Sequence, residues 1–168
     1  MAAGPFFQSD LLNFPYKNEF DLIGAFDVIE HIENDQLALE NIYEGLKPGG
    51  GVIISVPQHK FLWSFKDAYS GHKRRYGRAE LKGKVEEAGF KGLKIFSFTS
   101  FLLPLMYIAS LKYKKCSDTQ IEETIYNEFN ISSYLNKIFK LTASMELFFI
   151  KCGINFPFGG SLFIVAHK

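Results

Sequence analysis

Two carboxylates and one imidazole directly follow an apolar segment near the start of the chain. Residues 20–26 are mostly apolar, and Asp27, Glu30 and His31 come after them. A spacing of three and four residues can bring these side chains onto one helical turn, where they could hold a hard divalent cation. Alternatively, Glu30 and His31 form hydrogen bonds to the loop and the neighbouring helix. We therefore predict no metal ligand among these residues.

A second polar group lies in residues 58–76, where basic, aromatic and imidazole side chains occur together. Arg75 can bind a carboxylate or a phosphate through two parallel hydrogen bonds. His72 can act as a general base on a hydroxyl, because an unperturbed histidine has a pKa near 6.5. Trp63 and Tyr76 would supply an apolar wall, and the catalytic candidates are His72, Arg75 and Tyr76. In the alternative, this is a structural loop whose arginine and tyrosine side chains pair with Asp67 or Glu80.

The elements that position the first group follow from the apolar pattern. Residues 19–26 and 52–56 are apolar runs, the second rich in β-branched side chains, and both are typical of buried strands. Apolar residues at helical spacing between them predict a helix over about 35–46. Asn34 or Asp35 can cap this helix, and Lys47-Pro48-Gly49-Gly50 ends it.

The rest of the chain continues this alternation. We expect a helix over 78–88 with Gly89 as its C-cap, a strand over 93–98 and a last strand over 161–167. Residues 8–16 are interpreted as a short strand end and a loop. Alternating strands and helices predict an α/β fold with a largely parallel sheet, in one domain over 1–168. Residues 101–152 are expected to form a helical insertion, whose apolar stripes are core or, in the alternative, a lid over a lipid-like acceptor.

Composition limits the partners. The chain has 168 residues, a net charge of +1 and 47% hydrophobic residues, so no overall field attracts nucleic acid. The most apolar window, residues 98–111, is about 14 residues long, whereas a membrane-spanning helix needs roughly 20. We therefore expect no transmembrane segment. The window is interpreted as a buried helix or, in the alternative, as an interfacial helix that contacts lipid. Two cysteines are too few for a secreted disulfide framework, which favours a cytoplasmic location.

Four segments together point to a known family. They are Phe20-Asp21-Leu22-Ile23 through Glu30-His31, Leu46-Lys47-Pro48-Gly49-Gly50-Gly51 with residues 52–57, Glu87-Ala88-Gly89-Phe90, and Phe158-Gly159-Gly160-Ser161 with residues 162–166. In this order and combination they resemble the C-terminal portion of class I S-adenosylmethionine-dependent methyltransferases, of the type 11/12 kind. Leu62-Trp63-Ser64, Asp67 and Gly71-His72-Lys73-Arg74-Arg75-Tyr76 narrow the resemblance to small methyltransferases often linked to cell-envelope, glycan or lipid pathways.

The resemblance implies a partial Rossmann-like sheet with a third-strand remnant and strands four to seven, flanked by helices. It implies S-adenosylmethionine as cofactor, with Asp10 at the adenine amino group and Phe26 and Asp27 beside the methionine and sulfonium end. Glu30 is assigned to the same cofactor-binding group. The implied reaction is methyl transfer to a small-molecule acceptor. More specifically, we expect this acceptor to be linked to a lipid or a glycan. The rival hypothesis is a non-catalytic remnant that serves as a binding or assembly module.

One part of the family pattern is not found in these 168 residues. Family members carry a first strand that ends in a Gly-x-Gly loop, followed by a helix and a second strand. Gly49-Gly50-Gly51 ends a helix and starts a strand, whereas a nucleotide loop does the reverse. The strand over 20–26 would then be an apolar edge, which proteins normally avoid. We expect a homo-oligomer or a complementing polypeptide at this edge, unless the coding sequence extends upstream.

Overall fold

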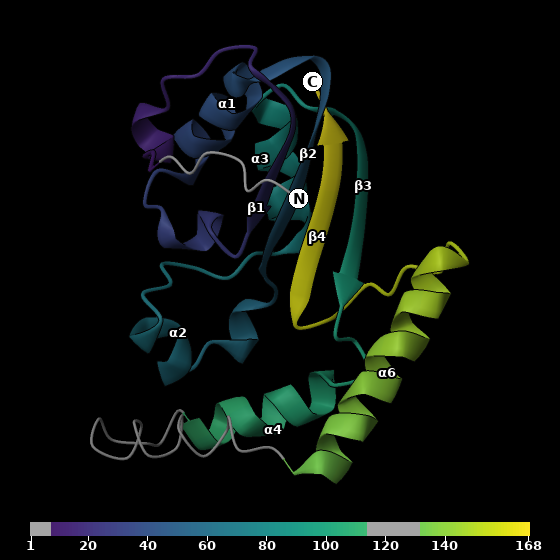
Figure 1. Cartoon of the computed structure of the whole chain (residues 1–168). Helices are drawn as coiled ribbons and strands as arrows, with labels where there is room; N and C mark the ends of the chain where they lie inside the picture. Colours follow the sequence, from purple (N-terminus) through teal and green to yellow (C-terminus); the bar gives the residue numbers. More distant parts are fainter. Residues whose placement is uncertain (1–7, 114–131) are drawn as a thin grey trace.

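The computed structural model describes residues 8–113 and 132–168, and its centre is a four-stranded sheet. The strands are β1 (Phe20–Phe26), β2 (Leu46–Pro57), β3 (Lys91–Phe98) and β4 (Ser161–His167). They lie in the order β1-β2-β4-β3, with β1 and β2 parallel and β4 antiparallel to both of its neighbours. The carboxyl ends of β1, β2 and β3 therefore meet at one edge of the sheet (Figure 1).

The central strands carry the core on one face of the sheet. In β4, buried and half-buried residues alternate along the strand, as a sheet with one fully covered face requires. Leu162 and Ile164 of β4 are fully buried together with Ile54 of β2. On the other face, Phe96 and Phe163 stack with ring centroids 5.4 Å apart and are only half-buried. The sheet is thus closed on one side and partly open on the other.

Two helices cover the closed face. They are α1 (Asp35–Gly45) and α3 (Arg78–Glu87), and both bury an apolar stripe in the same core. Asn34 caps α1, as expected, because its side-chain oxygen accepts a hydrogen bond from the backbone N–H of Leu37 at 3.3 Å. Gly89 follows α3 with φ +103°, a left-handed conformation that favours glycine after a helix.

Strand β2 begins earlier than the sequence predicts. The stretch Lys47-Pro48-Gly49-Gly50 does follow a helix end, but it already belongs to the strand. Gly49 has φ +79°, and a Cβ at Gly50 would lie 2.9 Å from the carbonyl oxygen of Lys47. The glycines therefore allow the chain to pass directly from α1 into β2 without a separate loop.

Residues 8–16 do not form the expected remnant of a third strand. They contain the 3-10 turn η1 (Leu11–Asn13), because the carboxylate of Asp10 accepts hydrogen bonds from the backbone N–H of Leu12 and the side chain of Asn13. Such a local cap competes with strand pairing. The turn is held against α1 by Asn41, which donates to the carbonyl of Leu11 at 2.7 Å.

The helical insertion lies below the carboxyl edge of the sheet (Figure 1). Its described helices are α4 (Leu103–Tyr113) and α6 (Ser133–Lys151), whereas residues 114–131, with Cys116, lie outside the described residues. The expectation that the apolar stripes are core is wrong for many of their members, since Ile108, Leu141 and Phe148 are 62–64% exposed. These helices extend past the sheet, so it cannot cover their outer faces. None of the described helices combines the length and apolarity needed to cross a bilayer.

Candidate functional site

The tip of β1 makes a sharp turn at the carboxyl edge of the sheet. Asp27 has φ +52°, a left-handed conformation that aspartate tolerates better than most residues. Its backbone N–H donates to the carbonyl of Ser55 at 3.0 Å, and the Ser55 hydroxyl donates to its carboxylate at 3.1 Å. This turn leads directly into the 3-10 turn η2 (Ile29–His31), which carries the two other polar residues of the first group.

Glu30 is fully buried, and neither of its carboxylate oxygens has a hydrogen-bond partner among the described residues. Burial raises the pKa of Glu30 to about 7, and the nearby charge of Asp27 acts in the same direction. The dipole of the Glu30 backbone amide and the proximity of His72 oppose this rise. Nε2 of His72 lies 4.0 Å from Oε1 of Glu30. A carboxylate in this position needs a proton or a cation beside it.

Asp67 organises the loop that follows β2. This loop contains η3 (Lys60–Leu62) and α2 (Phe65–Tyr69), and one oxygen of Asp67 accepts from the N-terminal backbone N–H at Ser64 at 2.9 Å. The other oxygen accepts from Nε of Arg75 at 2.7 Å and lies 3.0 Å from Nδ1 of His72. Burial opposes the charge of Asp67, but the hydrogen bonds from Arg75, the Ser64 backbone and His72, together with the charge of Arg75, outweigh it and keep the pKa below its usual range. The ionised Asp67 therefore assigns the Nδ1 proton to His72 and leaves Nε2 directed at Glu30.

Tyr76 belongs to a different buried group. It is fully buried, and its hydroxyl donates to Asp35 of α1 at 2.7 Å. Asp35 also accepts from Lys84 of α3 at 2.8 Å and forms an ion pair with Arg74 at 3.1 Å. Burial opposes ionisation of Asp35, but these hydrogen bonds and charges outweigh it and lower its pKa. Burial of the phenol, and then the hydrogen bond to the Asp35 carboxylate and its charge, raise the pKa of Tyr76. The group joins the loop to both helices of the core.

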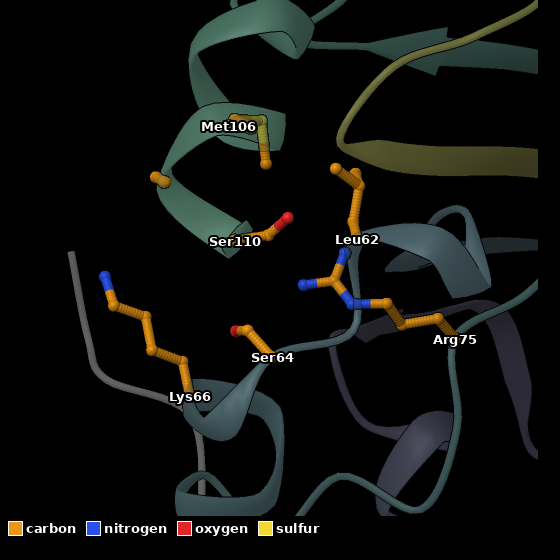
Figure 2. Close-up of a pocket in the computed structure, with 7 residues that line it drawn as sticks. Leu62, Ser64, Lys66, Arg75, Met106 and Ser110 are labelled. Atoms are coloured by element: carbon orange, nitrogen blue, oxygen red, sulfur yellow. The ribbon is translucent and has the colours of Figure 1, made fainter. Parts of the chain in front are cut away.

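A small cavity separates the loop from α4, and Figure 2 shows the guanidinium of Arg75 extending into it. The cavity measures about 140 Å³ and is lined by Leu62, Ser64, Lys66, Arg75, Met106, Ala109 and Ser110. Nε and Nη1 of Arg75 are held by Asp67 and by the carbonyl of Gln58, and no residue in the described part of the chain hydrogen-bonds to Nη2, which can therefore contact a ligand. Ligand pockets commonly measure about 300–1,000 Å³. The cavity can therefore hold a small anionic group but not a nucleoside cofactor.

Arg75 also borders a wider groove outside the cavity. This groove measures about 390 Å³ and is lined by Lys60, Trp63, Lys73, Arg74 and Arg75. A third, apolar groove lies beside α4 and is lined by Phe61, Leu103, Pro104 and Tyr107. The rings of Phe61 and Tyr107 meet edge to face at 5.9 Å, so this groove joins the loop to α4. Cationic and apolar surfaces thus adjoin on one side of the molecule.

The structure brings some of the sequence-predicted residues together and separates others. Glu30 and His72 meet, and Arg75 joins them through Asp67. Asp10 caps η1, and Phe26 is exposed at the tip of β1.

Ser64 and Lys66 line the cavity beside Arg75, and neither was predicted as a site residue. The spacing Ser64-x-x-Asp67 is a capping-box pattern, and it is the signal that could have predicted α2. No comparable sequence signal marks the cavity, because Met106 and Ser110 reach it from a separate helix.

Comparison with known proteins gives one family match. Residues 3–95, more than half of the chain, match a family model described as a methyltransferase domain. No curated protein matches the chain.

Several solved structures share the fold at low sequence identity. Phosphoethanolamine N-methyltransferase 2 of Haemonchus contortus, in complex with S-adenosyl-L-methionine, is 21% identical over 95% of this chain, with a TM-score of 0.53. A S-adenosylmethionine-dependent methyltransferase of Thermotoga maritima, described as a possible histamine N-methyltransferase, is 17% identical over 95%, with a TM-score of 0.55. One from Archaeoglobus fulgidus is 20% identical over 96%, with a TM-score of 0.54. The chain covers 36%, 62% and 66% of these three chains, respectively.

Proposed function

Because the chain belongs to the methyltransferase domain family, we propose that it takes part in methyl transfer from S-adenosylmethionine to a small-molecule acceptor. The family match over residues 3–95 is the observation that carries this proposal. In such a transfer, a lone pair of the acceptor attacks the methyl carbon while the bond from carbon to sulfur breaks. The protein mainly holds the two reactants in line, and a base removes any proton that the acceptor must lose.

We assign the cofactor to the carboxyl edge of β1, where ligands of open α/β sheets bind. Phe26 and Asp27 are exposed at this tip and are proposed to lie beside the methionine end of the cofactor. The exposed Asp10 is proposed to contact the adenine amino group. Glu30 is buried beneath the tip of β1 and is proposed to support the cofactor site from there. The Haemonchus contortus enzyme was solved in complex with S-adenosyl-L-methionine. Its likeness to this chain in fold supports the proposal.

A second polypeptide segment would complete this site. Among residues 8–113 and 132–168, β1 is hydrogen-bonded to β2 alone, and Leu22 on it is 60% exposed. An apolar edge of this kind accepts a further strand. We propose that a second copy of the chain or a complementing polypeptide pairs with β1 and supplies the remaining wall of the cofactor site. A non-catalytic assembly module, which would use the same edge, is the second candidate function.

The acceptor is proposed to carry an anionic group and an apolar part, as a lipid- or glycan-linked molecule would. Arg75 is the residue that links the small cavity to the basic groove, so it is proposed to bind the anionic group. The apolar groove with Phe61 and Tyr107 would take the rest, with α4 as a lid. His72 lines neither the cavity nor the basic groove. A cytoplasmic location remains part of the proposal.

Titration calorimetry with S-adenosylmethionine and S-adenosylhomocysteine tests the cofactor. We expect binding by the unmodified protein and a loss of at least about tenfold in affinity for Asp27→Ala. Asp21→Ala is the matched control, because Asp21 lies on the same strand but pairs with Lys47 at 2.9 Å, outside the proposed site. If neither compound binds, even after the complementing segment is added, methyl transfer is refuted and the assembly module is favoured.

A further inference from the structure

Two histidines and a glutamate from separate segments converge beside η2. Glu30 and His31 belong to η2, whereas His72 comes from the loop after α2. One ligand atom of each residue lies within 4.8 Å of the others. The rings of His31 and His72 meet edge to face with centroids 4.8 Å apart. We propose that Glu30, His31 and His72 form a binding site for one divalent transition-metal ion, and that Zn²⁺ fits it best.

The unpartnered carboxylate of Glu30 is the first observation behind this site. It is fully buried, and neither oxygen receives a hydrogen bond from residues 8–113 or 132–168. Buried carboxylates are normally hydrogen-bonded, paired with a cation or bound to a metal. Asp27, which the sequence spacing groups with Glu30, does not fill this role, because its carboxylate accepts from the Ser55 hydroxyl.

His72 is oriented as a metal-binding histidine usually is. Its Nδ1 lies 3.0 Å from Asp67, and its Nε2 faces Glu30 at 4.0 Å. Metal-bound histidines commonly donate their second N–H to a carboxylate, which fixes the ring and increases the basicity of the ligating nitrogen. Asp67 is itself held by Arg75 and by the backbone at Ser64. The outer layer of the site is therefore already formed.

The donor set selects the kind of ion. Two imidazole nitrogens and one carboxylate oxygen suit Zn²⁺ and similar transition metals, whereas Mg²⁺ and Ca²⁺ prefer oxygen ligands. Ligands at 2.0–2.1 Å in a tetrahedron lie about 3.3 Å apart. The three ligand atoms lie within 4.8 Å of one another. To bind one ion, each pair of these atoms must therefore come closer by about 1.5 Å at most. His31 is exposed and can make this movement by side-chain rotation.

The ion would fix the loop against the tip of β1. The backbone already meets there, since the N–H of Lys73 donates to the carbonyl of Glu30 at 2.8 Å. A metal between Glu30 and His72 would add a second link and hold Arg75 in place through Asp67. The rival explanation is a proton shared by Glu30 and His72, which needs neither His31 nor a metal.

Metal titration separates these two explanations. The tag-free protein is dialysed against a chelator and titrated with Zn²⁺ in a calorimeter, and Co²⁺ loading is followed by visible absorption. Glu30→Gln keeps the shape of the side chain and removes the buried charge, and His31→Ala changes an exposed residue, so both should fold. His167→Ala is the matched control, because His167 is an exposed histidine at the opposite end of the sheet.

We expect one Zn²⁺ per chain, a melting temperature that rises with the Zn²⁺ concentration, and a four-coordinate Co²⁺ spectrum. The affinity should fall at least about tenfold in Glu30→Gln and in His31→Ala and stay unchanged in His167→Ala. Absence of stoichiometric binding, or equal binding by the protein and its Glu30→Gln and His31→Ala variants, would overturn the proposal and leave the shared proton.

Discussion

Replacement of Tyr76 by phenylalanine separates a structural from a catalytic role for this residue. The Tyr76 hydroxyl donates to Asp35 at 2.7 Å in a fully buried position. A hydrogen bond to a charged group contributes about 1.5–3 kcal/mol to stability. Asp35 keeps Lys84 and Arg74 as partners, so the remaining carboxylate is not isolated. We therefore expect the lower limit, a loss of about 1.5 kcal/mol in the free energy of unfolding.

Denaturant unfolding, followed by circular dichroism, measures this loss. For a chain of this size, 1 kcal/mol corresponds to about 2–4 °C, so the melting temperature should fall by about 3–6 °C. Tyr69→Phe is the control, because Tyr69 is 56% exposed and its change should have no measurable effect. The slope of free energy against denaturant concentration should be the same in both variants and in the unmodified protein.

Two results would contradict this reasoning. If Tyr76→Phe unfolds within about 0.5 kcal/mol of the unmodified protein, the hydrogen bond to Asp35 does not stabilise the fold. If methyl transfer is lost in Tyr76→Phe while stability is unchanged, Tyr76 acts on the substrate. If Tyr76 has only a structural role, the rate of methyl transfer per folded molecule is the same in Tyr76→Phe and in the unmodified protein.

Three further predictions concern charge and glycine positions. The pKa of Asp35 is lowered by folding, so its contribution to stability is complete above the unfolded value of about 3.9 and is lost as the pH falls below it. Melting temperatures measured between about pH 5 and pH 2 should therefore fall less steeply in Asp35→Asn, and equal slopes would contradict the role of this carboxylate. Gly83→Ala should raise the free energy of unfolding by about 0.5–1 kcal/mol, because Gly83 lies inside α3 with open space around it; a loss in denaturant unfolding would show a hidden contact. Gly159→Ala should lower the free energy of unfolding by about 1–3 kcal/mol, because the added Cβ would clash with the carbonyl oxygen of Phe98, and an unchanged midpoint would show that this backbone can shift.

Local sequence signals predicted most of the regular elements. The last strand begins and ends as predicted, at Ser161 and His167, because a continuous apolar run follows a glycine pair. Helix α1 was also predicted, because Asn34 caps an apolar stripe at helical spacing. The start of β2 was not, since a stretch with proline and two glycines usually ends an element and here continues a strand.

Contacts between distant residues could not be predicted from local patterns. The pair Tyr76–Asp35 and the pair His72–Glu30 each join residues about 40 positions apart, and nothing in the neighbouring sequence indicates the partner. Exposure of α4 and α6 was missed for a related reason. An apolar stripe predicts that a helix face avoids water, but the element that covers this face depends on the tertiary arrangement.

The position of β4 has a consequence for how the protein is made. This strand is the last of the four to leave the ribosome, yet it lies between β2 and β3. The pair β1–β2 can form early with α1 as its crossover, whereas β3 has no partner in the sheet before residues 161–167 are synthesised. Pairing of Gly51 with His167 then closes a very long loop, and such distant contacts slow folding. The nascent chain must therefore keep the two strand edges that β4 later covers, one on β2 and one on β3, from aggregating until residues 161–167 emerge.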